Sequence, residues 1–328
     1  MAPFRLVVAI IVLYLALPVR GQPSSAPADS SQQAIDRRHV LIISIDGLRP
    51  DIMLRANTPN LRKLMNRGSF SMWAKTTPQS ITLPSHVSMV TGVNPNAHGI
   101  QWNSDLPLAK PVFSSYPTLF QLAKRAGYST ALVTGKSKLV SLTPPESLDW
   151  SWVSPDSSSD DSTVAERAIE LYSRNRPDVF FVHFPTTDNV GHAIGWGTDE
   201  QLNAVEAADA AVGRIIDSIE PAQRTGSTLI IISADHGGAG RTHGTEDARS
   251  RYIPWIAVGP GVRANYDLTR FGANHEVQTY DTFSTACYFL NITPPKRVEG
   301  KPIREMFDDA ELTRPDAPKP RLPTTQEH

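Results

Sequence analysis

The sequence predicts an α/β fold, organised as a three-layer α/β/α sandwich with a mostly parallel central sheet. Apolar runs of strand length, rich in Val and Ile, alternate along the chain with amphipathic stretches of helix length. Strands of this composition are typical of a parallel sheet that is covered by helices on both faces. The length of 328 residues and the hydrophobic fraction of 40% are sufficient for one such layered domain.

The expected strands are short runs dominated by β-branched and aromatic residues. The first has the sequence HVLIISI, a later one VFFVHF and another TLIIIS, and each is apolar at nearly every position. In chain order the expected strands are His39–Ile45, 129–133, Val179–Phe184, Thr228–Ser233 and 253–258.

The expected helices are the amphipathic stretches between these strands. In chain order they are 58–67, 84–90, 117–126, Asp161–Asn175, 200–219 and 280–290. Residues 137–160 are rich in Ser and Pro and have little periodicity, so this segment is expected to form a surface excursion.

The N-terminus has the features of a secretory signal peptide. Arg5 supplies a positive charge, residues 6–19 form an apolar run, and residues 19–21 offer a cleavage site. The run is shorter than the roughly 20 apolar residues that span a bilayer. Export to the periplasm or the extracellular space is therefore expected, with an uncleaved N-terminal membrane anchor as the alternative.

Composition defines the rest of the organisation. Residues 1–21 are the expected signal peptide, 22–36 a linker rich in Ser, Pro and Ala, 37–311 the folded domain and 312–328 a disordered tail.

The mature chain is expected to contain no membrane span. A net charge of -1 gives no indication of a basic surface for a nucleic-acid duplex, and no duplex binding is expected. Cys287, the only cysteine, is expected to be a buried structural thiol. The oligomeric state stays open.

Two polar clusters carry a strand-end carboxylate and a hydroxyl group. Asp46 closes the first apolar strand, where the side chain could either bind a ligand or cap the following turn. Thr82 lies close to the start of an expected helix, where free N–H groups and the helix dipole favour anions such as phosphate. Its alternative role is that of a helix cap.

Two further clusters combine carboxylate and imidazole groups. Asp188 and His192 are four residues apart, so one helical turn can present both on one face. Asp235 and His236 directly follow the strand TLIIIS, and His243 follows across a Gly-rich loop. These ligand types suit zinc or a similar divalent metal. Three Asp, three His and one Thr are enough for two metal ions with a hydroxyl nucleophile between them.

The order of these motifs resembles the alkaline phosphatase superfamily, and most closely its type I phosphodiesterase/nucleotide pyrophosphatase branch. The resemblance covers roughly residues 39–307. The stretches that carry it are IDGLRPD at 45–51, TLPSHVSMVTGVNPNAHGI at 82–100, DNVGHAIG at 188–195 and DHGGAGRTHG at 235–244. It implies an alkaline phosphatase-like fold and hydrolysis of a small phosphorylated substrate through a covalent phospho-threonine intermediate.

The resemblance also implies roles for individual residues. Thr82 is the implied nucleophile, and Asn103 is the implied contact to the substrate phosphate. Both metal ions are implied to be zinc. The implied ligands of one ion are Asp188, His192 and His243, and those of the other are Asp46, Thr82, Asp235 and His236. His275 is the rival of His243. His86 and His98 are expected either to be structural or to contact the site residues from behind, and His183 is expected to be packed in its strand.

Departures from the family pattern bear on the substrate. The gap between His236 and His243 is short, so the long insertion of nucleotide-cleaving members is absent and their nucleotide contacts cannot be transferred. No arginine or third-metal ligand for a dianionic monoester is identified, and Arg49 and Lys136 are the nearest candidates. A phosphodiester is therefore favoured, with phosphomonoester or phosphonate hydrolysis as the alternative.

Other activities on this scaffold receive less support from the sequence. A phosphotransferase or mutase usually carries a second domain, for which the chain leaves little room. A non-catalytic metal-binding module is disfavoured by the intact ligand set. A sulfatase needs a Cys or Ser in a specific Pro- and Arg-containing motif, and Cys287 has no such context.

Overall fold

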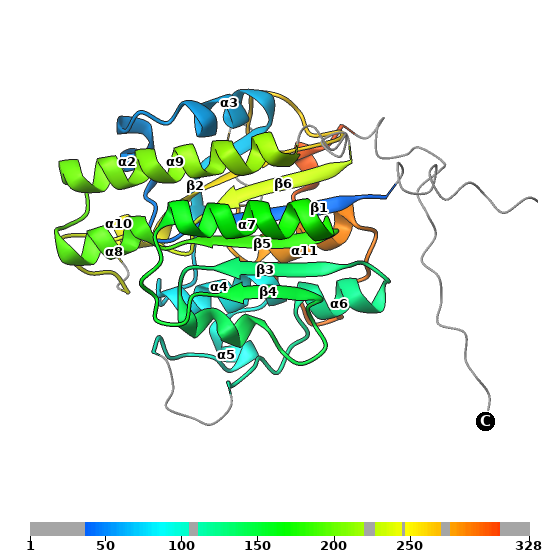
Figure 1. Cartoon of the computed structure of the whole chain (residues 1–328). Helices are drawn as coiled ribbons and strands as arrows, with labels where there is room; N and C mark the ends of the chain where they lie inside the picture. Colours follow the sequence, from blue (N-terminus) through cyan, green and yellow to red (C-terminus); the bar gives the residue numbers. More distant parts are fainter. Residues whose placement is uncertain (1–36, 105–110, 220–226, 245–246, 270–275, 309–328) are drawn as a thin grey trace, which may run out of the picture.

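The structure is a computed structural model that describes residues 37–104, 111–219, 227–244, 247–269 and 276–308. In this part of the chain an 8-stranded sheet has helices on both faces (Figure 1). The predicted α/β sandwich with a mostly parallel sheet is therefore confirmed. The expected signal peptide 1–21, linker 22–36 and tail 312–328 lie outside the described residues.

The sheet has the strand order β4-β3-β5-β1-β6-β7-β2-β8. Strands β4, β3, β5, β1 and β6 are parallel, whereas β7 is antiparallel to both of its neighbours. The strands are β1 His39–Ile45, β2 Ser69–Lys75, β3 Thr130–Thr134, β4 Trp150–Val153, β5 Val179–Phe184, β6 Thr228–Ser233, β7 Tyr252–Val258 and β8 Tyr266–Asp267.

Helices α2, α3, α7 and α9 cover one face of the sheet, and α4, α6 and α11 cover the other (Figure 1). The α-helices are α2 Pro50–Arg55, α3 Pro59–Arg67, α4 Thr82–Thr91, α5 Pro95–His98, α6 Leu119–Arg125, α7 Asp161–Asn175, α8 Thr186–Ala193, α9 Asp199–Ile219, α10 Ala248–Arg251 and α11 Asp281–Phe289. Two short 3-10 helices are η1 Ser137–Leu142 and η3 Arg304–Met306. No described helix combines the length and apolarity that crossing a bilayer requires.

The centre of the sheet is its most apolar part. Every residue of β1, β5 and β6 is buried. Full burial of a Val, Ile or Phe side chain stabilises the fold by about 1.5–3 kcal/mol. These three strands therefore form a rigid support for the segments that follow them. Cys287 is buried in α11 as expected, and burial raises the pKa of its thiol to about 12.

A reciprocal pair of hydrogen bonds joins the first turns of α7 and α8. The backbone N–H of Asp161 donates to Thr186 Oγ1 at 3.0 Å, and the backbone N–H of Thr186 donates to Asp161 Oδ1 at 2.9 Å. Each side chain thereby satisfies an N–H group that a helix start leaves free. The pair fixes the start of α8, which carries two of the predicted ligands.

The prediction for residues 137–160 is wrong. This segment contains η1, whose Leu139 and Leu142 are buried, and β4, which pairs with β3 at one edge of the sheet. β4 has four residues and is mostly half-exposed, so it has no long apolar run for the sequence to reveal. Strand β2 was not predicted for a similar reason, and helix α4 begins at Thr82, two residues before the predicted 84–90.

Candidate metal centre

The predicted site residues follow the carboxyl ends of neighbouring strands. β1 lies between β5 and β6, and Ile45 of β1 pairs with Phe184 of β5. The segments that leave these strands start at one edge of the sheet, where open α/β sheets place their ligand sites. They carry Asp46 after β1, Asp188 and His192 on α8 after β5, and Asp235, His236 and His243 after β6.

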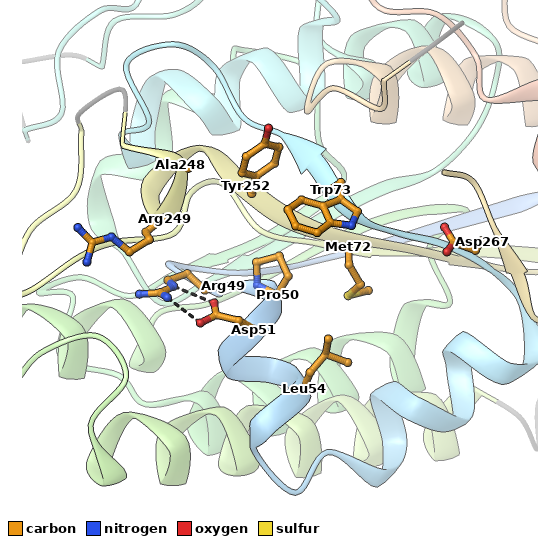
Figure 2. A pocket seen from close by; sticks show the side chains of 10 residues that line it. All are labelled: Arg49, Pro50, Asp51, Leu54, Met72, Trp73, Ala248, Arg249, Tyr252 and Asp267. Carbon is orange, nitrogen blue, oxygen red and sulfur yellow. Dashed lines mark hydrogen bonds and ion pairs between the residues drawn. The ribbon is translucent and has the colours of Figure 1, made fainter. Parts of the chain in front are cut away.

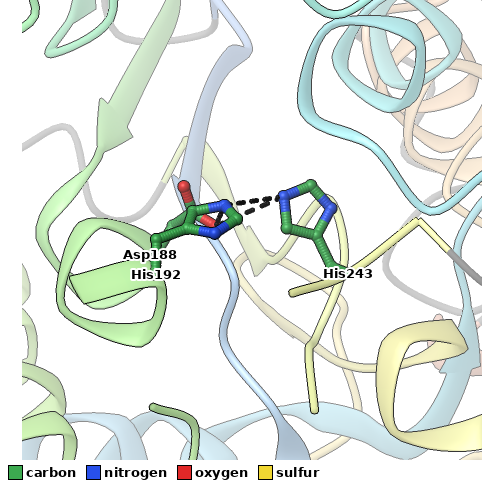
Figure 3. Close-up of side chains that lie close together, drawn as sticks. All are labelled: Asp188, His192 and His243. Atoms are coloured by element: carbon green, nitrogen blue, oxygen red, sulfur yellow. Dashed lines mark hydrogen bonds and ion pairs between the residues drawn. The ribbon is translucent and has the colours of Figure 1, made fainter. Parts of the chain in front are cut away.

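One group of three side chains has the geometry of a metal site. The nearest ligand atoms of Asp188, His192 and His243 all lie within 4.8 Å of one another (Figure 3). His192 Nε2 is 3.4 Å from Asp188 Oδ1, and His243 Nε2 is 3.7 Å from the same oxygen. One turn of α8 separates Asp188 from His192, as the sequence predicts. His275, the rival of His243, lies outside the described residues.

The two histidine rings of this group are oriented by the backbone. His192 Nδ1 lies 3.0 Å from the carbonyl oxygen of Arg241, and His243 Nδ1 lies 2.9 Å from that of Ser80. A carbonyl oxygen can only accept, so both Nδ1 atoms carry the hydrogen. Both Nε2 atoms are then lone-pair donors, and both face Asp188. Histidine ligands of metals are commonly held in this way.

A second group lies deeper in the same site. Asp46, Asp188 and His236 are buried, and their ligand atoms also lie within 4.8 Å of one another. His236 Nδ1 donates to the carbonyl of Gly237 at 2.8 Å, which leaves Nε2 free to face Asp46 Oδ1 at 3.3 Å. Burial, followed by the neighbouring His243, lowers the pKa of His236 to about 3. The ring is therefore neutral, as a metal ligand must be.

Thr82 reaches this second group from the opposite face of the sheet. It is the first residue of α4, and its Oγ1 lies 3.2 Å from His236 Nε2. The hydroxyl is thus buried at a helix N-terminus and directly beside the ligand cluster. This placement suits a hydroxyl that must approach an anionic phosphoryl group.

Each of three buried carboxylates leaves one oxygen without a hydrogen-bond partner. These oxygens are Asp46 Oδ1, Asp188 Oδ1 and Asp235 Oδ2. Asp235 Oδ2 lies 3.2 Å from His236 Nε2, while its other oxygen accepts from backbone N–H groups. A buried carboxylate oxygen without a partner is costly, because the group has lost water and gained nothing. Divalent cations would satisfy all three, so the residues present fit metal ions.

Lys136 engages the other oxygen of two of these carboxylates. Its Nζ lies 2.7 Å from Asp46 Oδ2 and 2.5 Å from Asp188 Oδ2. Although burial disfavours the ammonium ion, the two carboxylates raise the pKa of Lys136. Lys136 in turn opposes the effect of burial on Asp46 and holds the pKa of that carboxyl well below its usual range. The sequence suggests Lys136 as a candidate for phosphate binding. In the structure it instead forms ion pairs with two of the predicted metal ligands, Asp46 and Asp188.

The structure also gives two other histidines a place in the site. His183, expected only to be packed in its strand, is buried in β5, and its Nε2 lies 3.0 Å from Asp46 Oδ2. His86 lies between Ser44 Oγ and the backbone carbonyl of Thr82, each at 2.8 Å. His86 is therefore a structural support of the Thr82 helix, as expected. A polar residue in an otherwise apolar strand was the only sequence signal for the role of His183.

Asn103 lies at the start of α4, close to Thr82. Its Oδ1 accepts a hydrogen bond of 2.9 Å from the backbone N–H of Leu83, the residue after Thr82. Lys138 Nζ donates to the same oxygen at 3.3 Å and to the Asn103 carbonyl at 3.2 Å. The predicted phosphate contact therefore lies at the helix N-terminus, with an unpredicted lysine beside it.

Trp196 supports three of the ligand-bearing segments at once. Its Nε1 donates to the carbonyl of Gly47 at 2.8 Å. A Cβ atom on Gly47, Gly191 or Gly238 would lie 3.1, 2.7 or 2.3 Å from the indole ring, respectively. Gly47 follows Asp46, Gly191 lies inside the α8 ligand turn, and Gly238 lies in the loop that leads to His243. Close contact with one rigid ring therefore sets the spacing of all three segments.

A separate hollow of about 480 Å³ lies beside α2 and β2 (Figure 2). Pro50, Leu54, Met72 and Trp73 form much of its wall. Arg49, at its edge, is paired with Asp51 at 2.7 Å and also donates to the carbonyl of Gly238. The hollow thus contains none of the predicted metal ligands, and Arg49 is engaged away from them.

Sequence comparisons with known proteins agree on one family. The family model described as Type I phosphodiesterase / nucleotide pyrophosphatase matches residues 40–250. An uncharacterised pyrophosphatase/phosphodiesterase of Schizosaccharomyces pombe is 27% identical over 217 residues, which cover 61% of this chain and 44% of that protein. Ectonucleotide pyrophosphatase/phosphodiesterase family member 3 of Rattus norvegicus is 24% identical over 240 residues, which cover 65% of this chain and 26% of that protein. The chain therefore spans less than half the length of these relatives.

Solved structures show the same fold at low sequence identity. Murine ectonucleotide pyrophosphatase/phosphodiesterase 5, in an inactive form in complex with AMP, has a TM-score of 0.67 at 15% identity, covering 83% of this chain and 100% of that one. A 2-O GAG sulfatase has a TM-score of 0.65 at 17% identity, covering 82% of this chain and 74% of that one.

Proposed function

This chain belongs to the type I phosphodiesterase / nucleotide pyrophosphatase family, and from that membership we propose that it is a metal-dependent hydrolase of phosphodiesters that acts through a covalent phospho-threonine at Thr82. One observation carries the proposal. Three buried carboxylates each leave one oxygen without a hydrogen-bond partner, and these oxygens face imidazole nitrogens beside the Thr82 hydroxyl.

The proposal assigns two divalent metal ions, most simply zinc, to the site. Nitrogen and carboxylate oxygen ligands in open sites are typical of catalytic zinc. When bound, the metals would favour the ionised Thr82 hydroxyl and neutralise phosphoryl oxygens. Asp188, His192 and His243 would hold one ion, and Asp46, Thr82, Asp235 and His236 would hold the other.

The reaction proceeds in two displacements at phosphorus. Thr82 Oγ1 forms a bond to phosphorus, and the bond from phosphorus to the leaving oxygen breaks. The leaving oxygen departs as an alcohol, with a net transfer of the threonine proton. Water then attacks the phospho-threonine, which releases a phosphomonoester and restores the hydroxyl. The backbone N–H of Leu83 lies at the start of α4 and is available for a phosphoryl oxygen once Asn103 Oδ1 moves away.

The substrate proposed is a small phosphodiester, with phosphomonoester or phosphonate hydrolysis as the second candidate. A phosphodiester brings one negative charge to a site that already holds Asp46, Asp188 and Asp235. The AMP complex of the similar murine protein supports a small nucleotide as one form of the substrate. The N-terminal sequence supports export as the setting in which the enzyme works.

A single set of measurements tests this function. Purified protein loaded with zinc is analysed for metal content and assayed with bis-nitrophenyl phosphate, mono-nitrophenyl phosphate, nucleotide diesters and a phosphonate monoester. We expect about two bound metals per chain and turnover that stops when a chelator removes them. Metal binding without turnover of any ester would instead identify a non-catalytic metal-binding module.

A further inference from the structure

Lys138 lies near the N-terminus of α4, beside Asn103, and has no role in the proposed mechanism. It belongs to η1, which follows β3, and its side chain is half-buried. Its Nζ donates only to the backbone carbonyl and the side-chain oxygen of Asn103, at 3.2 and 3.3 Å, among the contacts of the described residues. The ammonium ion is therefore fixed in position without being neutralised by a carboxylate.

Two donors converge on one oxygen position next to the nucleophile. Asn103 Oδ1 receives the ammonium hydrogen of Lys138 and the backbone N–H of Leu83, at 3.3 and 2.9 Å. Leu83 follows Thr82 in the first turn of the ten-residue helix α4, where backbone N–H groups have no partner within the helix. An amide oxygen is neutral. A phosphoryl oxygen in the same place would carry negative charge and form stronger bonds with both donors.

The other cations that the sequence suggested are already engaged. Arg49 is paired with Asp51, and Lys136 is paired with Asp46 and Asp188. Lys138 has no such ion pair in the described part of the chain. It nevertheless lies within electrostatic reach of the metal ligands. Burial is the main cause that lowers the pKa of Lys138, and the nearby Lys136 ammonium lowers it further. The carboxylates of the site raise it.

We propose that Lys138 is a specificity-determining residue that binds the additional charged oxygen of a terminal phosphoryl group. The site would then accept dianionic phosphomonoesters as well as diesters. In the bound state a phosphoryl oxygen replaces Asn103 Oδ1 as the acceptor for Lys138 and Leu83 N–H. In a diester the ester oxygens carry no full charge, so the same ammonium contributes less. The proposal rests on the proposed function, because it concerns the substrate range of that same site.

The kinetic test compares two esters in matched variants. Lys138→Met and Lys138→Gln remove the charge, Lys138→Arg keeps it, and Lys63→Met removes an exposed charge in α3 as the control. We expect Lys138→Met to lower kcat/KM for mono-nitrophenyl phosphate by about 10- to 100-fold, the range for loss of a charge-assisted hydrogen bond. The loss for bis-nitrophenyl phosphate should be less than about threefold, with unchanged zinc content. Lys138→Arg should retain most of the monoester activity.

A binding test without turnover separates this proposal from the proposed function. Inorganic phosphate should stabilise the zinc-loaded wild-type protein and Lys63→Met against thermal unfolding, and should stabilise Lys138→Met and Lys138→Gln much less. Equal losses for both esters, or wild-type behaviour of both charge-removing variants, would overturn the role of Lys138 while the hydrolase stands. Lys138-dependent phosphate binding without hydrolysis of any ester would support Lys138 and overturn the proposed function.

Discussion

The Nε2 atoms of His192 and His243 lie 3.0 Å apart, and in the neutral tautomers that bind a metal neither of them carries a hydrogen. Both rings have their Nδ1 hydrogen committed to backbone carbonyls of Arg241 and Ser80. Two lone pairs at this separation repel one another. A cation bound by both nitrogens and by Asp188 Oδ1 would remove this repulsion. The close approach of the two nitrogens is therefore a strong argument for a metal site here.

Removing either imidazole should therefore remove a metal. His192→Ala and His243→Ala are each expected to lower the zinc content of the purified protein by about one ion per chain and to abolish turnover, because each ion has few protein ligands to lose. Elemental analysis of protein and metal gives the stoichiometry. His275→Ala serves as the comparison and should retain the metal. Loss of zinc from His275→Ala with retention in His243→Ala would reverse the assignment of this ligand.

Thr82→Ala should abolish turnover while the protein stays folded and retains most of its metal. In the proposed mechanism the threonine supplies the covalent step, and the other proposed ligands remain in place. Thr82→Ser is the matched control, since it keeps a hydroxyl at the same position and should keep measurable activity. Residual activity of Thr82→Ala within about tenfold of wild type would show that another group attacks the phosphorus.

The wild-type enzyme should prefer a diester to a monoester. A monoester brings a second negative charge close to the three aspartates, and Lys138 offsets that charge only in part. The measurement is kcat/KM for bis- and mono-nitrophenyl phosphate at one pH. A monoester preference above about a hundredfold, or roughly 2.7 kcal/mol, would contradict the assignment as a diesterase.

Lys136→Met should destabilise the metal-free protein more than the zinc-loaded protein. Without the ammonium ion, Asp46 and Asp188 are two buried carboxylates with no cation between them. Removing one partner of a buried ion pair costs about 3–5 kcal/mol. Urea unfolding with and without chelator measures the difference. Lys124→Met is the control, because its pair with Asp149 is partly exposed to solvent and surface pairs contribute only about 0–1 kcal/mol.

Asp161→Asn should make stability less dependent on pH. Burial raises the pKa of Asp161 from its usual 3.8 to about 7, so between these pH values the folded state holds a proton that the unfolded state has lost. Wild-type stability therefore falls as pH rises from about 4 to about 7, by up to roughly 4 kcal/mol, and changes little above that. Asn keeps an acceptor for the Thr186 N–H and carries no proton to lose.

The comparison is made by chemical unfolding of metal-free protein at several pH values. Asp161→Asn should exceed wild type in stability most clearly at about pH 8 and should approach it at about pH 4. Parallel stability profiles for the two proteins would show that Asp161 ionises normally in the folded state.

Much of the site could be predicted because its residues follow strands. Asp46 and Asp235 come directly after long apolar runs, and the carboxyl ends of parallel strands meet at one edge of a sheet. Asp188 and His192 have the spacing of a helical turn, and α8 places them on one face. Local pattern and global topology agree at these positions, so the sequence is enough to predict that these side chains lie close together.

Lys136 and His183 could not be placed from the sequence with the same success. Their partner Asp46 is distant along the chain. His183 contacts Asp46 because β5 lies beside β1, and Lys136 contacts it because β3 lies next to β5 in turn, with Thr134 opposite His183. Strand order is a property of the whole sheet, and no local pattern contains it. The edge strand β4 was missed because a short, half-exposed strand is stabilised by its neighbour rather than by its own apolar run.

Trp196 packs against Gly47, Gly191 and Gly238. The side chains that can be accommodated at these three positions therefore depend on the size of the residue at position 196. Gly191→Ala places a methyl group 2.7 Å from the indole ring, which is its nearest obstacle. A smaller side chain at position 196 frees the space, so the second substitution compensates for the first. Sequences without this tryptophan are therefore expected to accept a larger residue at position 191 more readily than this chain does.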